Sequence, residues 1–156
     1  MIAALDRLLA QVEHRVAAHV GERHGKVTRQ FLQFALIGVQ GFAWDNAVVY
    51  STAPFVGPYW AAVFSYFIVG TINWGLNRVW TYRDHDHGPL RSQLPKFLAA
   101  NAIGFVLNRG TFALMVATLH IPYRYYVFPL AMGTGAGMIA NFVFSRRFVF
   151  HQSPHE

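Results

Sequence analysis

The sequence contains no cysteine and few charged residues. None of its 156 residues is Cys, and Asp, Glu, Lys and Arg together make up 13% of the chain. The absence of cysteine excludes disulfides, thiolate nucleophiles and cysteine-ligated metals. A water-soluble domain usually has about 25% charged residues, so the deficit indicates a chain that contacts lipid. A hydrophobic content of 54% and a mean hydropathy of +0.27 agree with this interpretation.

Long apolar runs predict an all-α membrane protein. A helix needs roughly 17–25 mainly apolar residues to cross the hydrocarbon core of a bilayer. The sequence has four such runs, at about 31–52, 58–79, 95–119 and 125–148. We therefore expect one transmembrane domain of four helices. The expected divisions of the chain are an N-terminal helix at 1–29, the transmembrane domain at 30–151 and a tail at 152–156.

The basic residues are unevenly distributed along the chain. Thirteen Lys and Arg against seven Asp and Glu give a net charge of +6. If the four runs alternate in direction, every basic residue except Arg109 and Arg124 falls on one side of the membrane or before the first run. That side is expected to be cytoplasmic, so both termini of this multi-pass chain lie inside. The charge is thus explained by topology, and no nucleic-acid partner is expected.

The first 29 residues form a separate amphipathic segment. Apolar residues from Ile2 to Val20 recur at helical spacing, with charged residues between them. This pattern predicts a helix on the cytoplasmic membrane surface, ended by Gly21 and Gly25. A helix that packs on the loops is the alternative. Charges of both signs up to Arg29 and the lack of a small-residue cleavage site argue against a signal peptide.

The second and fourth runs end in the same pattern. Asn73, Trp74, Arg78, Trp80 and Tyr82 align with Asn141, Phe142, Arg146, Phe148 and Phe150 at a constant shift of 68 residues. A weaker similarity relates FLQFALIG at 31–38 to FLAANAIG at 97–104, at a shift of 66. The chain therefore resembles two helical hairpins that begin and end on the same side, which makes them parallel repeats.

These features resemble the GtrA-like membrane proteins. The resemblance rests on the order of the four runs, the opening FLQFALIGVQGF, and the paired endings NWGLNRVWTY and NFVFSRRFVF, and it covers about residues 30–151. It implies a role in cell-surface polysaccharide synthesis, in which the protein moves polyprenyl-phosphate-linked sugars across the bacterial inner membrane. Ser145 stands where the first repeat has Asn77, so the two repeats need not bind the same group.

Polar residues near the ends of the even-numbered runs are the first candidate site. Asn73 and Asn77 lie four residues apart on one helical face, inside an apolar zone where an unpaired amide is costly. One interpretation is hydrogen bonding between helices. The other is a cytoplasmic vestibule for a lipid phosphate, because guanidinium groups match phosphate geometry. The vestibule residues are Asn73, Asn77, Arg78, Asn141 and Arg146. Arg83 and Arg147 are expected to be interfacial anchors.

Two opposite charges lie deep in the first and third runs. Asp45 and Arg109 are 13 or 14 residues from the expected cytoplasmic entries, about 20 Å deep at 1.5 Å per residue. A lone charge at that depth is costly, so we predict an ion pair between them, direct or through water, flanked by Asn46 and Asn108. One interpretation is that the pair only fixes the packing of the two halves. The other is that a passing phosphate competes with Asp45 for Arg109.

Other motifs carry weaker predictions. Gly133 and Gly137 form a GxxxG pair, which favours close packing within the chain or a homodimer seam. His85, Asp86 and His87 are adjacent in a loop and lack distant partners, so no metal site is expected. No GxSxG or Walker sequence occurs, and we expect neither enzymatic activity nor a cofactor.

The sequence thus favours binding and transbilayer movement of a polyprenyl-phosphate-linked sugar. Surrounding membrane lipids are the other expected partner. A non-catalytic scaffold that recruits a membrane glycosyltransferase through the N-terminal helix and the basic loop 78–96 is the main alternative. A small multidrug-type exporter is a third, although such a protein would be expected to lack an arginine at the depth of its carboxylate.

Overall fold

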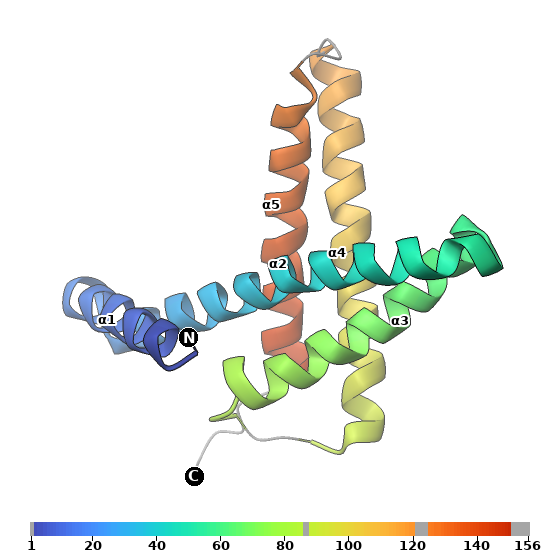
Figure 1. Ribbon diagram of the computed structural model, residues 1–156. Helices are drawn as coiled ribbons and strands as arrows, with labels where there is room; N and C mark the ends of the chain where they lie inside the picture. The colour runs from blue at the N-terminus through green and yellow to red at the C-terminus, as the bar shows by residue number, and fades with distance from the viewer. Residues whose placement is uncertain (1, 86–87, 121–124, 151–156) are drawn as a thin grey trace. The chain divides into compact units, whose positions relative to one another are not determined.

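The computed structural model describes residues 2–85, 88–120 and 125–150, and in these ranges it consists of helices joined by short turns and loops (Figure 1). The expectation of an all-α chain is confirmed. The elements are α1 (Ile2–Val20), α2 (Glu22–Val56), α3 (Pro58–Leu76), the π-helical turn η1 (Asn77–Thr81), α4 (Leu90–Leu119), α5 (Val127–Phe144) and the π-helical turn η3 (Ser145–Val149). The chain divides into two compact units, Met1–Arg83 and Asp84–Glu156.

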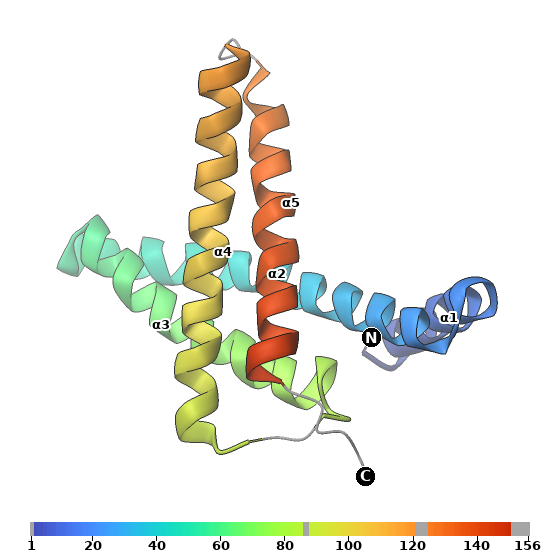
Figure 2. The same cartoon turned by 180° about the vertical axis from the view of Figure 1, so that it is seen from behind.

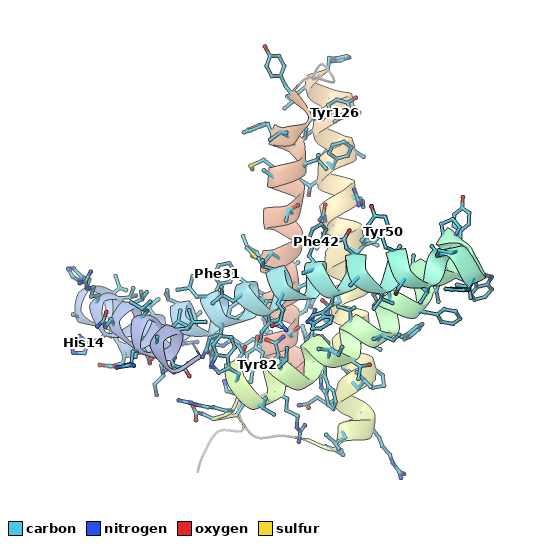
Figure 3. All side chains as sticks on the ribbon, in the orientation of Figure 1. His14, Phe31, Phe42, Tyr50, Tyr82 and Tyr126 are labelled. Atoms are coloured by element: carbon cyan, nitrogen blue, oxygen red, sulfur yellow. The ribbon has the colours of Figure 1, made fainter. Side chains whose placement is uncertain are left out.

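The first unit is a hairpin of α2 and α3, with α1 packed on the first part of α2. Gly57 joins α2 to α3 with φ of +79°, a conformation that glycine adopts without strain, and Pro58 begins the next helix. Figure 1 shows α3 running back along α2. The large aromatic residues Phe42 and Tyr50 lie along the opposite side of α2 (Figure 3) and are 72% and 79% exposed.

The expected amphipathic helix is α1, and it ends at Val20, where Gly21 has φ of +95°. Gly25 lies inside α2, where a Cβ would be 2.6 Å from the carbonyl oxygen of Glu13. Its missing side chain therefore lets α1 approach α2 closely. Of the apolar stripe of α1, Leu9 is buried at 6% exposure, whereas Leu8 and Val20 are more than half exposed. Attachment of the remaining face to a membrane surface stays a prediction.

An ion-pair cluster connects α1 with the first and last turns of the first hairpin, near the start of α2 and after the end of α3. Arg29 of α2 contacts Glu13 at 3.0 Å and Asp6 at 3.7 Å, and Asp6 also accepts a 2.9 Å hydrogen bond from the indole of Trp80. Trp80 belongs to η1. The acidic residues of α1 thus connect the start of α2 with the end of α3. Because α2 begins at Glu22, the expected boundary at residue 29 lies inside a continuous helix.

The second unit is a hairpin of α4 and α5, which lie side by side in both views (Figures 1 and 2). The glycine pair of α5 makes this contact. A Cβ on Gly133 would be 2.5 Å from the carbonyl oxygen of Asn108, and a Cβ on Gly137 would be 2.7 Å from that of Gly104. The GxxxG motif therefore packs α5 on α4 within the chain, as one of the two sequence interpretations predicted. Gly135 faces open space.

Two segments of the described residues are long and apolar enough to cross a membrane, Leu90–Leu119 and Val127–Val149. Only 6% of the most apolar stretch of the first and 22% of the second is buried, whereas the core helix of a water-soluble protein would be mostly buried. Helix α2 contains Gln, Asp and Asn, and α3 is rich in Tyr and Trp, which lowers their hydropathy. Four membrane spans remain the prediction made from the sequence.

The contact of Gly137 with α4 gives a direct test of the second hairpin. Gly137→Ala places a methyl group against backbone that cannot rotate away, so it should lower the free energy of unfolding by about 1–3 kcal/mol. Gly135→Ala on the same helix meets nothing within 4 Å and should be neutral or slightly stabilising, because alanine favours helix. Thermal unfolding in detergent measures both. Equal stability of the two variants would contradict this packing.

Candidate functional site

Most buried positions of the two hairpins match one another, at one constant shift for each pair of equivalent helices. Along α3 and α5 they match at the expected shift of 68, as the pairs Ala61/Pro129, Ser65/Gly133, Val69/Gly137, Asn77/Ser145, Thr81/Val149 and Tyr82/Phe150. Along α2 and α4 they match at a shift of 63, as Phe34/Phe97, Ile37/Ala100 and Gly41/Gly104. The expected shift of 66 for these two helices is therefore wrong, because similar residues in the segments 31–38 and 97–104 lie on different helical faces.

An asparagine packs on a glycine at the same place in each hairpin. The side chain of Asn73 occupies the space beside Gly41, and that of Asn141 occupies the space beside Gly104. The Oδ1 atoms of both amides are buried and accept no conventional hydrogen bond among the described residues. Their position beside glycine suits weak Cα–H···O contacts, which recur where helices meet closely. This arrangement supports the helix-packing interpretation of Asn73 and Asn141.

Each of these helices ends in a π-turn that carries a candidate arginine. The backbone N–H of Tyr82 donates to the carbonyl of Asn77 at 2.9 Å, and that of Phe150 donates to Ser145 at 2.8 Å. A bond of this i→i+5 type is rare and is often found at functional sites. Here it rotates Tyr82 and Phe150 inward, where both are fully buried. Figure 3 shows Tyr82 at the end of the first hairpin nearest α1.

The arginines at these turns, Arg78 and Arg146, are half-buried, and Arg78 lies beside an aromatic ring. The guanidinium of Arg78 lies 5.9 Å from the centre of the Trp74 ring, a distance at which a cation is attracted to the ring face. Arg146 is equivalent to Arg78 and is also half-buried. Arg83 and Arg147 are exposed, which agrees with the expected anchoring role. The repeat therefore provides one guanidinium at the same place in each hairpin.

Asn77 is the polar residue most deeply enclosed by the first π-turn. It is 2% exposed and donates a 2.9 Å hydrogen bond from Nδ2 to the carbonyl of Asn73, while its Oδ1 has no partner among the described residues. In the second hairpin the fully buried Ser145 takes its place. Sequence reasoning missed Thr81, which is 4% exposed and lies four residues after Asn77.

Asp45 is bound within its own hairpin by a residue that sequence reasoning did not assign. The hydroxyl of Ser65, which is fully buried, donates to Oδ1 of Asp45 at 2.5 Å, a short bond of the kind that charged acceptors make. The equivalent contact in the second hairpin is between Asn108 and Gly133. Asn46, expected to flank the charge pair, instead donates to the carbonyl of Phe42 at 2.7 Å. Asp45 therefore joins α2 to α3.

Arg109 lies on the exposed side of α4. Its guanidinium is 5.5 Å from the centre of the Phe105 ring, one turn back along the same helix. In the register of the two hairpins, Asp45 corresponds to Asn108 and Arg109 corresponds to Asn46. They belong to different units, and their ion pair stays a prediction.

The loop motif around His85 has a structural role that the sequence did not suggest. The imidazole is 6% exposed, and its Nδ1 lies 2.7 Å from the carbonyl oxygen of Phe150, so it holds the loop against the end of η3. Gln93 donates to the adjacent carbonyl of Val149 at 3.2 Å. Asp86 and His87, the other members of the weak metal motif, lie outside the described residues. No cluster of three potential metal ligands occurs among the described residues.

Burial lowers the pKa of His85, and the nearby charge of Arg146 lowers it further, while the bond to Phe150 and the charge of Asp84 oppose the shift. The unfolded chain, with the ordinary pKa of about 6.5, therefore binds a proton before the folded chain does as the pH falls. The free energy of unfolding should decrease from about pH 7 to pH 5. His85→Gln should reduce this slope, and the exposed His24→Gln should not, as measured by denaturation across that range. Equal slopes for the two variants would contradict the role of His85.

Comparison with known families agrees with this architecture. Residues 33–150 match the family model described as GtrA/DPMS, transmembrane domain, a region that includes most of α2, the whole of α3, α4 and α5, and both π-turns. No curated protein matches the chain. Since the matched region covers well over half of the sequence, the resemblance noted from the repeated endings is confirmed. The chain is a membrane protein and belongs to the GtrA/DPMS transmembrane-domain family.

Proposed function

We propose that this protein binds a polyprenyl-phosphate-linked sugar and moves it between the leaflets of the bacterial inner membrane. The family supports handling of a sugar on a carrier lipid, and the paired endings within the matched region contain Arg78 and Arg146. In this proposal the chain crosses the membrane four times with both termini in the cytoplasm. It performs no catalysis and uses no cofactor.

The observation that carries the proposal is the position of Arg109. This residue lies within Leu90–Leu119, an apolar segment long enough to cross a membrane. It is nevertheless exposed, and among the described residues its guanidinium lies only over the ring of Phe105. A charged side chain at membrane depth costs several kcal/mol when it faces acyl chains. Arg109 therefore needs an anionic or aqueous surface outside its own hairpin. A lipid phosphate that passes along this face supplies the required charge.

The arginines at the π-turns extend the same argument to the membrane surface. Arg78 and Arg146 are held beside the ends of α3 and α5, where a guanidinium reaches the headgroup level. Each can form paired hydrogen bonds with phosphate oxygens. In the proposal they receive the phosphate on the cytoplasmic side and Arg109 contacts it deeper in the membrane.

The bond between Ser65 and Asp45 changes one part of the mechanism expected from the sequence. Because Ser65 holds one carboxylate oxygen of Asp45 inside the first hairpin, Asp45 is better suited to orienting α2 on α3 than to binding the headgroup directly. Its second oxygen can still accept from Arg109 when no lipid is bound. The phosphate would then replace this oxygen as the partner of Arg109.

A scaffold that recruits a glycosyltransferase is the second candidate. Helix α1 is anchored through Asp6 and Glu13 and leaves His14, Arg15 and His19 exposed. Such a basic surface suits an acidic partner. In this case the hairpins would need no route for a headgroup, and a homodimer would serve only to present two copies of α1.

Leaflet exchange in liposomes distinguishes the two candidates. Wild-type protein should accelerate exchange of at least one lipid in a panel of polyprenyl-phosphate sugars. Arg109→Ala should reduce the rate of leaflet exchange roughly tenfold or more, since a charge-assisted hydrogen bond to the phosphate is lost. Arg109→Lys keeps the positive charge and should retain part of the exchange rate. Arg147→Ala, which removes an exposed surface arginine, is the matched control.

Two results would contradict the transport proposal. Exchange that the wild-type protein leaves unchanged for every lipid in the panel would favour the scaffold. Failure of the Arg109→Ala chain to accumulate as folded protein, with normal exchange by Arg109→Lys, would show that the positive charge is needed for assembly and not for recognition of the headgroup. Size-exclusion elution in detergent reports on folding in both cases.

A further inference from the structure

The π-turn at the end of the first hairpin contains buried polar atoms that have no hydrogen-bond partner among the described residues. They are Oδ1 of Asn77 and Oγ1 of Thr81, whose residues are 2% and 4% exposed. The second hairpin has one such atom at the equivalent turn, Oγ of Ser145. The unpaired amide oxygens of Asn73 and Asn141 differ from these, because the facing glycines account for their packing.

The fold does not require the Thr81 hydroxyl. A buried polar atom without a partner is destabilising, and most such atoms in native proteins are satisfied. The equivalent residue of the second hairpin is Val149, which is nearly isosteric with threonine and 7% exposed. The same turn therefore forms with an apolar side chain. A hydroxyl that destabilises a position where valine fits calls for a functional explanation.

The chemistry of these atoms indicates what they bind. An amide oxygen accepts hydrogen bonds only, and a threonine hydroxyl both donates and accepts. Ionised phosphate oxygens are acceptors and find no donor in the Asn77 oxygen. Sugar hydroxyls both donate and accept, so they match both atoms. The phosphate of the same lipid has a suitable partner in Arg78, the next residue after Asn77.

The location also provides a way to expose the atoms. Each has less than 1 Å² of accessible surface, so a ligand reaches them only when the end of α3 moves. The backbone bond from Tyr82 to Asn77 belongs to a π-turn, an irregular element that is often found at functional sites. Movement there leaves the glycine contact of Asn73 unchanged, one turn earlier.

From these observations we infer that η1 is a subsite for the sugar hydroxyls of the carrier lipid, formed by Asn77 and Thr81 next to the phosphate-binding Arg78. The subsite rests on the proposed function and adds the part of the substrate that each residue recognises. The second hairpin has Ser145 and Val149 at the matching positions, so it provides fewer hydrogen-bond partners for the hydroxyls of a sugar. The two π-turns thus differ in their recognition of the sugar.

Binding to protein in lipid nanodiscs tests the inference with two classes of probe. One is polyprenyl phosphate alone, and the other is a panel of polyprenyl-phosphate hexoses. Wild type should bind at least one hexose lipid more tightly than the bare phosphate. Thr81→Val should weaken the binding of that hexose lipid about three- to tenfold, because one hydrogen bond is lost. The affinity for polyprenyl phosphate should change by less than about twofold.

Two matched variants control for structure. Thr81→Ser keeps the hydroxyl and should retain the preference for the hexose lipid. Thr71→Val removes a threonine hydroxyl from the exposed side of the same hairpin, where it bonds to the carbonyl of Phe67 at 2.7 Å, and should leave both affinities unchanged. Without ligand, Thr81→Val should melt at or above the wild-type temperature, because no partner is lost.

The outcomes separate the subsite from the proposed function. Wild type that binds neither class of lipid overturns both. Wild type that binds the bare phosphate as tightly as every hexose lipid overturns the subsite alone, as does a Thr81→Val variant that keeps the full preference. A clear decrease in the melting temperature of Thr81→Val would show that the hydroxyl has a partner within the fold, and this result also overturns the inference.

Discussion

Close contact between a glycine and an asparagine determines how each hairpin of this protein is built. Asn73 lies on Gly41 and Asn141 lies on Gly104, and a Cβ at either glycine would displace the asparagine side chain from its place. The contact fixes the register between the two helices of each hairpin. Once this register is set, the residues four and eight positions after each asparagine lie in the interior, and the arginines of the π-turns, Arg78 and Arg146, are half-buried.

The two hairpins use the same register with different chemistry. In the second, Gly133 and Gly137 bring α5 against the backbone of α4. In the first, Ser65 and Val69 occupy those positions, and the hydroxyl of Ser65 binds Asp45. One hairpin is thus joined by backbone contact and the other by a polar bond. Duplication followed by divergence of this kind leaves a common framework with unequal binding properties, which suits a ligand that has two chemically different parts.

Much of this arrangement could be predicted from the sequence. The repeated Asn, Arg and aromatic residues gave the correct shift of 68 for α3 and α5, because residue type there follows burial closely. The shift for α2 and α4 could not be read from FLQFALIG and FLAANAIG, since apolar residues face both lipid and the neighbouring helix. A comparison centred on Gly41 and Gly104 would have found it. The bond from Ser65 to Asp45 and the π-turns depend on the register and on backbone rotation, which residue types do not reveal.

The length of α2 has a consequence for the edge of the membrane. Its 35 residues extend about 52 Å at 1.5 Å per residue, whereas the hydrocarbon core of a bilayer is about 30 Å thick. An upright helix of this length projects roughly 20 Å beyond the acyl chains. If its apolar part spans the core, the projecting part bears Arg29 and the docked α1. The start of α2 and the docked α1 then form a helical extension beyond the acyl chains.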